Sequence, residues 1–208
     1  VIFLLVLTLF ISSCTGNVCT ASCNVPMQYL ADPTDSNTPW SSESWQAEVM
    51  TYDYALKVAT STSVAGVVEV QSLAAFSLPT EVSFGFATAT SSSDIMSVQL
   101  PVISTGNTAL NFQMYGTDFT YTTSSRTYTI PISAIHLATT SGVIYSQGTT
   151  LTTFTSPINL RSFLAKPTSI STTASTTVWL GSLLSVPAIS GNYHGIITVL
   201  GSAASLPW

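Results

Sequence analysis

The sequence predicts an all-β protein of the β-sandwich class, either immunoglobulin-like or jelly-roll. Short segments rich in β-branched and aromatic residues recur at spacings of roughly 8 to 14 positions, separated by Gly, Pro, Ser and Asn. No long segment has the 3.6-residue period of an amphipathic helix. Hydrophobic residues make up 46% of the chain and charged residues only 6%, while Ser and Thr account for close to a third. We therefore expect strands whose exposed faces are covered by hydroxyl groups.

The expected strands cover residues 48–59, 64–72, 81–90, 95–103, 109–115, 118–123, 127–132, 142–146, 149–155, 175–180 and 193–200. The alternation is clear in 81–90, where Val82, Phe84 and Phe86 fall on one face. Pro131 lacks a backbone N–H, which favours an edge position for the strand at 127–132. One short helical turn is predicted at 158–166.

The amino terminus is an apolar run without charge, at residues 1–11. A helix of this length would rise only about 16 Å, well short of the roughly 30 Å hydrocarbon core of a membrane. An extended strand would reach about 36 Å. We expect this strand to leave its own domain and complete the sandwich of a neighbouring copy, which is incomplete without it. The expected donor residues are Val1, Ile2, Phe3, Leu4, Leu5, Val6, Leu7, Leu9, Phe10 and Ile11.

The chain is expected to divide into three parts. Residues 1–13 are the donor strand, 14–46 a cysteine-containing junction and loop, and 47–208 the β-sandwich domain. The loop assignment follows from the prolines, aspartates and serines that are concentrated between residues 24 and 46.

Cys14, Cys19 and Cys23 lie directly after the apolar run. A zinc site is disfavoured, because there is no Cys-X-X-Cys pair and both histidines are distant in the sequence. A disulfide is favoured, from Cys14 to Cys23 or from Cys19 to Cys23, and it would indicate an oxidising compartment. The segment ending at Cys14 also resembles a bacterial lipoprotein cleavage box, in which Cys14 would carry the lipid.

Several function classes find no support. The basic residues Lys57, Arg126, Arg161 and Lys166 are scattered, which disfavours nucleic acid as a partner. There is no Gly-X-Ser-X-Gly motif, and no Ser, His and acid set that would form a catalytic triad. Asp32, Asp35 and Asn37 could offer oxygen ligands to calcium, but turn chemistry explains them better. We predict no catalytic residue, no metal and no cofactor.

The carboxy-terminal segment 191–200 carries a resemblance to a known family. It resembles the final Gly-x-Tyr-x-Gly-x-x-x-Val strand of pilin subunits assembled by donor-strand complementation, such as fimbrial major subunits, spore-coat-U-like pilins and archaeal thread-type pilins. The residues that match this pattern, with the apolar position between them, are Gly191, Tyr193, Gly195, Ile197 and Val199. The resemblance implies an incomplete immunoglobulin-like sandwich that receives its missing strand from the next subunit.

The expected function is a secreted structural subunit of an extracellular filament that polymerises head to tail and serves adhesion or biofilm cohesion. Its partners would be identical subunits and a receptor on a host cell or surface, with membrane contact only during export. The alternative is a membrane- or lipid-anchored β-sandwich that binds glycans through exposed Trp and Tyr. A type IV pilin is disfavoured, because its apolar amino-terminal helix would be about twice as long.

Overall fold

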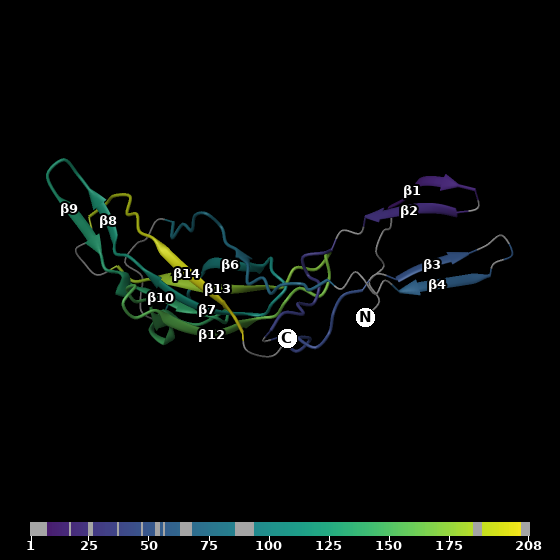
Figure 1. The fold of residues 1–208 in the computed structure, drawn as a ribbon. Coiled ribbons are helices and arrows are strands. Elements are labelled where there is room, and N and C mark those ends of the chain that lie inside the picture. Colours follow the sequence, from purple (N-terminus) through teal and green to yellow (C-terminus); the bar gives the residue numbers. More distant parts are fainter. Residues whose placement is uncertain are drawn as a thin grey trace.

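Two antiparallel sheets face each other in the computed structural model of this chain, which confirms the predicted all-β class (Figure 1). The structure describes residues 8–16, 18–24, 27–36, 38–46, 48–52, 55, 57–62, 68–85, 94–184 and 189–204. Helical structure in these ranges is limited to two short 3-10 turns, η1 (Ile132–Ala134) and η2 (Tyr145–Gln147).

The larger sheet has five strands in the order β11-β10-β13-β6-β5. These strands are β5 (Phe76–Ser77), β6 (Val98–Ser104), β10 (Ile135–Ala138), β11 (Thr149–Thr150) and β13 (Ser175–Ser182). The central pair, β13 and β6, is the longest, whereas the edge strands β5 and β11 have only two residues each.

The smaller sheet has three strands in the order β12-β7-β14, with β12 at Ile158–Leu164, β7 at Leu110–Gly116 and β14 at Ile197–Ala203. Leu110, Phe112 and Met114 alternate with exposed residues along β7 and are at most 1% exposed. This period of two turns one face of the strand toward the larger sheet. Burying side chains of this size contributes about 1.5–3 kcal/mol each.

The core of the sandwich lies between the two sheets. From the larger sheet it takes the inward-facing residues of β6, β10 and β13, including Val102, Leu137 and Val178. From the smaller sheet it takes β7 together with Leu160 and Leu164 of β12. The sandwich therefore has a single continuous hydrophobic core built from both sheets.

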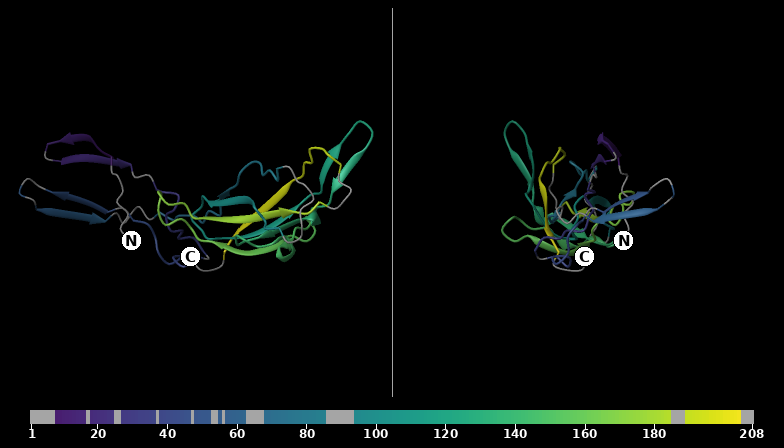
Figure 2. Two further views of the ribbon diagram at one scale, coloured as in Figure 1. Left: turned by 180° about the vertical axis from the view of Figure 1, so that it is seen from behind. Right: turned by 45° about the vertical axis from the view of Figure 1, so that its right-hand side comes forward.

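Three hairpins extend beyond the sandwich. β1 (Thr8–Thr15) pairs with β2 (Val18–Asn24), and β3 (Glu48–Tyr52) pairs with β4 (Val58–Thr62). Both project from one end of the molecule, and the hairpin of β8 (Phe119–Thr122) and β9 (Thr127–Ile130) projects from the opposite end (Figures 1 and 2). The result is an elongated subunit with differently built ends.

Some predicted elements differ from the structure. The helical turn expected at 158–166 is wrong: this segment contains β12, and its apolar residues Ile158, Leu160 and Leu164 sit at even spacing as in a strand. The segment 142–146 has an isolated bridge at Ile144 and then enters η2 where a strand was expected, and only the first two residues of 149–155 form β11. Residues 81–85 are not in a strand, and 86–90 lie outside the described residues.

Candidate assembly surfaces

The amino-terminal apolar run is partly described, and its described part belongs to a hairpin. Leu9, Phe10 and Ile11 lie in β1, which pairs along its length with β2. The other expected donor residues, Val1, Ile2, Phe3, Leu4, Leu5, Val6 and Leu7, lie outside the described residues. The described part of the segment, residues 8–11, is thus one half of a two-stranded sheet.

The β1–β2 and β3–β4 hairpins are each a two-stranded sheet with no third strand among the described residues. Both extend away from the sandwich core (Figure 1 and the left view of Figure 2). A two-stranded hairpin is marginally stable in water unless it packs on another element. The pairing within each hairpin is therefore its only backbone pairing among the described residues.

The cysteines are placed by the register of the β1–β2 hairpin. Cys14 and Cys19 are directly paired Cα positions, whereas Cys23 lies opposite Leu9. The hairpin thus brings together a pair that was not among the expected ones, and it places Cys23 several positions away from either partner.

The outer edge of β14 is unpaired among the described residues. Thr117 donates its N–H to the carbonyl of Ile196 at 2.9 Å, and Ala204 donates to the carbonyl of Ala109 at 2.8 Å. Because hydrogen-bonding direction alternates along an antiparallel strand, even-numbered residues of β14 face β7 and odd-numbered residues face outward. Four residues therefore have N–H and C=O groups that point outward and find no partner in the described part of the chain: Ile197, Val199, Gly201 and Ala203. An edge of this kind is a template for pairing with another strand.

The β14 edge is also apolar. The side chains of Ile197 and Val199 pack against the core but are only partly buried, and Leu200 is 42% exposed on the outer face. Across the gap, the larger sheet contributes the partly buried Phe76, whose ring meets that of Phe112 edge-on at 5.2 Å. An added strand could cover these half-buried residues.

Gly201 has a packing role at this edge. A Cβ at this position would overlap the ring of Phe76. Glycine therefore allows the ring of Phe76 to pack against the backbone of β14.

The first part of the carboxy-terminal motif, residues 191–196, precedes β14 and lies against the β8–β9 hairpin. Gly191 and Gly195 lack side chains where the rings of Tyr121 and Phe119 lie, so each glycine accommodates one aromatic ring. The strand expected at 193–200 begins at Ile197. Ahead of it, His194 exchanges backbone hydrogen bonds with Thr120 at 2.9 and 3.0 Å.

An aromatic cluster lies on the same hairpin. Tyr121 stacks with Tyr128 at a ring-centroid distance of 6.5 Å and meets Tyr193 at 5.7 Å. All three rings are partly exposed. The described tryptophans Trp40, Trp45 and Trp179 are half-buried, and Trp208 lies outside the described residues.

Hydrogen bonds of a buried asparagine side chain attach the base of the amino-terminal hairpins to the sandwich. Asn107 is 3% exposed; its amide donates to the carbonyls of Ala31 and Gln71, and its oxygen accepts from the N–H of Leu73. These bonds tie the 27–46 loop and the 68–73 segment to the turn between β6 and β7. Asn107 had not been identified from the sequence, since its partner Ala31 is 76 positions away.

Lys166 supplies the charged part of this attachment. It forms an ion pair with Asp32 and lies over the ring of Trp40, 5.1 Å from the ring centroid. Burial lowers the pKa of Lys166 below its usual range. Asp35 accepts a hydrogen bond from Ser72 at 2.6 Å. Asp32 and Asp35, for which turn chemistry was favoured over calcium binding, thus both have protein partners, and Asn37 lies outside the described residues.

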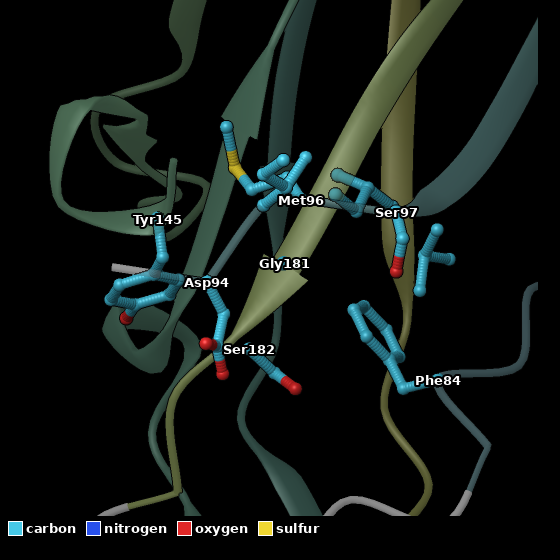
Figure 3. Close-up of a pocket in the computed structure, with 10 residues that line it drawn as sticks. Phe84, Asp94, Met96, Ser97, Tyr145, Gly181 and Ser182 are labelled. Carbon is cyan, nitrogen blue, oxygen red and sulfur yellow. The ribbon is translucent and has the colours of Figure 1, made fainter. Parts of the chain in front are cut away.

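A small pocket opens at the end of the larger sheet, with Phe84, Asp94, Met96, Tyr145 and Ser182 among its lining residues (Figure 3). Its volume of about 100 Å³ is below the roughly 300–1,000 Å³ of ordinary ligand sites. Next to it, the His136 ring stacks on that of Tyr145 at 4.0 Å. His136 Nδ1 lies 2.8 Å from the carbonyl of Tyr145, and Nε2 lies 3.0 Å from Thr150 Oγ1. Both ring nitrogens are engaged, which favours a packing role for His136.

The described residues hold no group of three or more His, Cys, Asp or Glu side chains arranged to bind a metal ion. They also include no helix with the length and hydropathy needed to cross a bilayer.

Comparison with known proteins gives no match: no family model matches the chain, and neither the curated proteins nor the solved structures compared contain a similar one.

Proposed function

We propose that this protein is a structural subunit of an extracellular filament, in which copies join head to tail by strand complementation and the filament serves adhesion or biofilm cohesion. The observation that carries the proposal is the unpaired edge of β14, where the backbone groups of Ile197, Val199, Gly201 and Ala203 have no partner among the described residues. Strand addition at such an edge gives affinity through main-chain hydrogen bonds and specificity through alternate side chains.

The amino-terminal segment is the donor in this proposal. β1 has eight residues and β14 has seven, so their lengths match. The three-stranded sheet also has two strands fewer than the sheet that faces it. A β1–β2 hairpin from a neighbour would supply two strands, keep its own pairing and cover the half-buried residues of β14.

The acceptor edge and the donor hairpin belong to different parts of the subunit. The hairpin points away from its own sandwich, so it lies far from its own β14 (Figure 1). Each copy would then donate to one neighbour and accept from another. A heterologous contact of this kind produces an open filament unless the rotation closes a ring.

The proposal is tested by blocking the acceptor edge. Ala203→Pro removes an outward-facing N–H and puts a ring at the edge, and proline is tolerated there because no bond to β7 is lost. The matched control is Ala203→Val, which keeps the N–H. We expect Ala203→Pro to raise the protein concentration needed for filament formation roughly tenfold, because a main-chain hydrogen bond is lost and the ring obstructs pairing. The control should assemble like the unmodified chain, as scored by light scattering and negative-stain electron microscopy.

Equal assembly by the proline and valine variants would contradict an acceptor role for β14. Both variants should show the thermal unfolding transition of the unmodified monomer, so that a loss of assembly is not a loss of folding.

The Tyr121, Tyr128 and Tyr193 cluster favours a second function, glycan binding at the β8–β9 end. Partly exposed aromatic rings offer apolar faces on which sugar rings can stack. Replacing Tyr121 and Tyr128 with Ser should abolish retention on a glycan array while leaving assembly intact. Unchanged retention, or no retention by the unmodified protein, would remove this function.

A further inference from the structure

We infer that Cys14 and Cys19 form a disulfide across the β1–β2 hairpin and that Cys23 keeps its thiol. The inference rests on the backbone register, which pairs the Cα positions of Cys14 and Cys19 directly and pairs Cys23 with Leu9. It does not depend on filament formation.

The turn determines which kind of pair Cys14 and Cys19 form. Thr15 pairs with Val18, so the strands are joined by a two-residue loop that starts with Gly16 at φ +62°. A positive φ at this position is required by the two-residue turns that match the twist of a hairpin. In such a turn the flanking pair is hydrogen-bonded, which makes the next pair, Cys14 with Cys19, a non-hydrogen-bonded one.

The spacing of this pair suits a disulfide. Directly opposed residues at a non-hydrogen-bonded position have Cα atoms about 4.5 Å apart. Disulfides span Cα distances of about 4.4–6.8 Å, so the bridge needs no movement of the backbone. The register irregularity lies between Ile11 and Ser13, on the far side of the pair from the turn.

The same register excludes the two pairings expected from the sequence. Cys19 and Cys23 are four residues apart on one extended strand, which places their Cα atoms about 13 Å apart. Cys14 is separated from Cys23 by a comparable distance along the ladder, because Cys23 lies opposite Leu9. Both distances exceed the roughly 7 Å limit for a bridge without backbone movement.

The bridge forms by thiol–disulfide exchange with a low-molecular-weight disulfide such as oxidised glutathione. The thiolate of one cysteine attacks this disulfide and releases one small thiol, and the second cysteine then displaces the other. Two cysteine thiols are oxidised to one S–S bond, and one small disulfide is reduced to two thiols. A hairpin without a core of its own would gain from this link, because the cross-link restricts its unfolded state.

The test is a thiol count on the full chain. The protein is equilibrated in a glutathione redox buffer under native conditions, then denatured and alkylated with a maleimide. We expect one alkylated cysteine in the unmodified chain, none in Cys23→Ser, and two each in Cys14→Ser and Cys19→Ser. Three alkylated cysteines in the unmodified chain, or two in Cys23→Ser, would overturn the inference.

Mass spectrometry of the unmodified chain gives a second readout that needs no variant. The peptide that contains all three cysteines should weigh two hydrogen atoms less than its reduced form. Backbone fragmentation between Cys19 and Cys23 should release the Cys23 side as a free ion, because no bridge retains it. Retention of that fragment until reduction would show a link to Cys23 and contradict the inference.

Discussion

The sandwich and the amino-terminal hairpins are built from similar strands but obtain stability in different ways. In the sandwich, both sheets bury a shared face, and residues such as Leu110 and Phe112 are inaccessible to solvent. The β1–β2 and β3–β4 hairpins have backbone pairing but no opposing sheet among the described residues. The sandwich thus has a buried core of its own, whereas the described parts of the two hairpins are held by the pairing of two strands.

The largest expected effect is on the free energy of unfolding, and it should differ between substitutions in the sandwich core and in the β1–β2 hairpin. Phe112→Ala should lower the free energy of unfolding of the monomer by about 3–5 kcal/mol, because it opens a cavity in the core between the sheets. Phe10→Ala in β1 should leave the monomer's unfolding transition unchanged, because β1 adds no strand to the sandwich. Urea unfolding of both variants checks this, and an equal loss in the two would break the comparison.

The junction between the regions should show the next largest effect. Asn107→Ala removes three hydrogen bonds from a buried position and leaves the carbonyls of Ala31 and Gln71 without these partners. At about 1 kcal/mol for each bond, we expect a loss of about 2–3 kcal/mol. Hydrogen exchange should increase in residues 27–36 as the loop detaches. Unchanged exchange there would show that other contacts hold the loop.

The contact between Phe76 and the backbone of β14 is tested by Gly201→Ala. The added methyl group would overlap the Phe76 ring, so we expect a loss of about 1–2 kcal/mol from overpacking. Phe76→Leu should restore part of this loss when the two changes are combined, as measured in a double-mutant cycle. Strictly additive effects would contradict the contact.

The smallest effect concerns pH. Burial raises the pKa of Tyr145 above 10.0, so the folded state keeps the phenol proton to a higher pH than the unfolded state does. The stability that this shift provides is present below pH 10.0 and is lost as the pH rises through the folded pKa. Tyr145→Phe should therefore lose less stability than the unmodified chain between neutral pH and a pH above 10.0.

Urea unfolding of the unmodified chain and of Tyr145→Phe over this pH range measures the difference in stability. The lowered pKa of Lys166 acts in the opposite direction, raising stability as the pH approaches 10.5, but it is common to both proteins. Parallel pH profiles for the two would contradict the shift assigned to Tyr145.

Local patterns were sufficient for the strands that build the core. Alternating apolar residues located β6, β7 and β13 close to their observed bounds. The strand β12 was missed because Arg161 and Phe163 interrupt a clean contrast between its two faces. The β1–β2 hairpin had a visible signal in Gly16 followed by Asn17, a common hairpin loop, but the length of the apolar run favoured a single strand.

The candidate site depends on tertiary structure and was harder to predict. Whether β14 lies at an edge follows from strand order, which a single sequence does not reveal. The ion pair of Asp32 with Lys166 joins positions 134 residues apart, and no local pattern connects them. The glycines of the carboxy-terminal motif were recognised from the sequence. That they make room for the rings of Phe119 and Tyr121 could be seen only from the packing of the β8–β9 hairpin.

The central claim is that the amino-terminal segment joins one subunit to the next, and negative-stain electron microscopy tests it most directly. The full chain is compared with a chain that lacks residues 1–24, after confirming that both have the same unfolding transition. We predict filaments from the full chain and dispersed monomers from the shortened one, with a synthetic 1–24 peptide binding to the shortened chain in a one-to-one complex. Dispersed monomers from both chains, or filaments from both, would contradict the account.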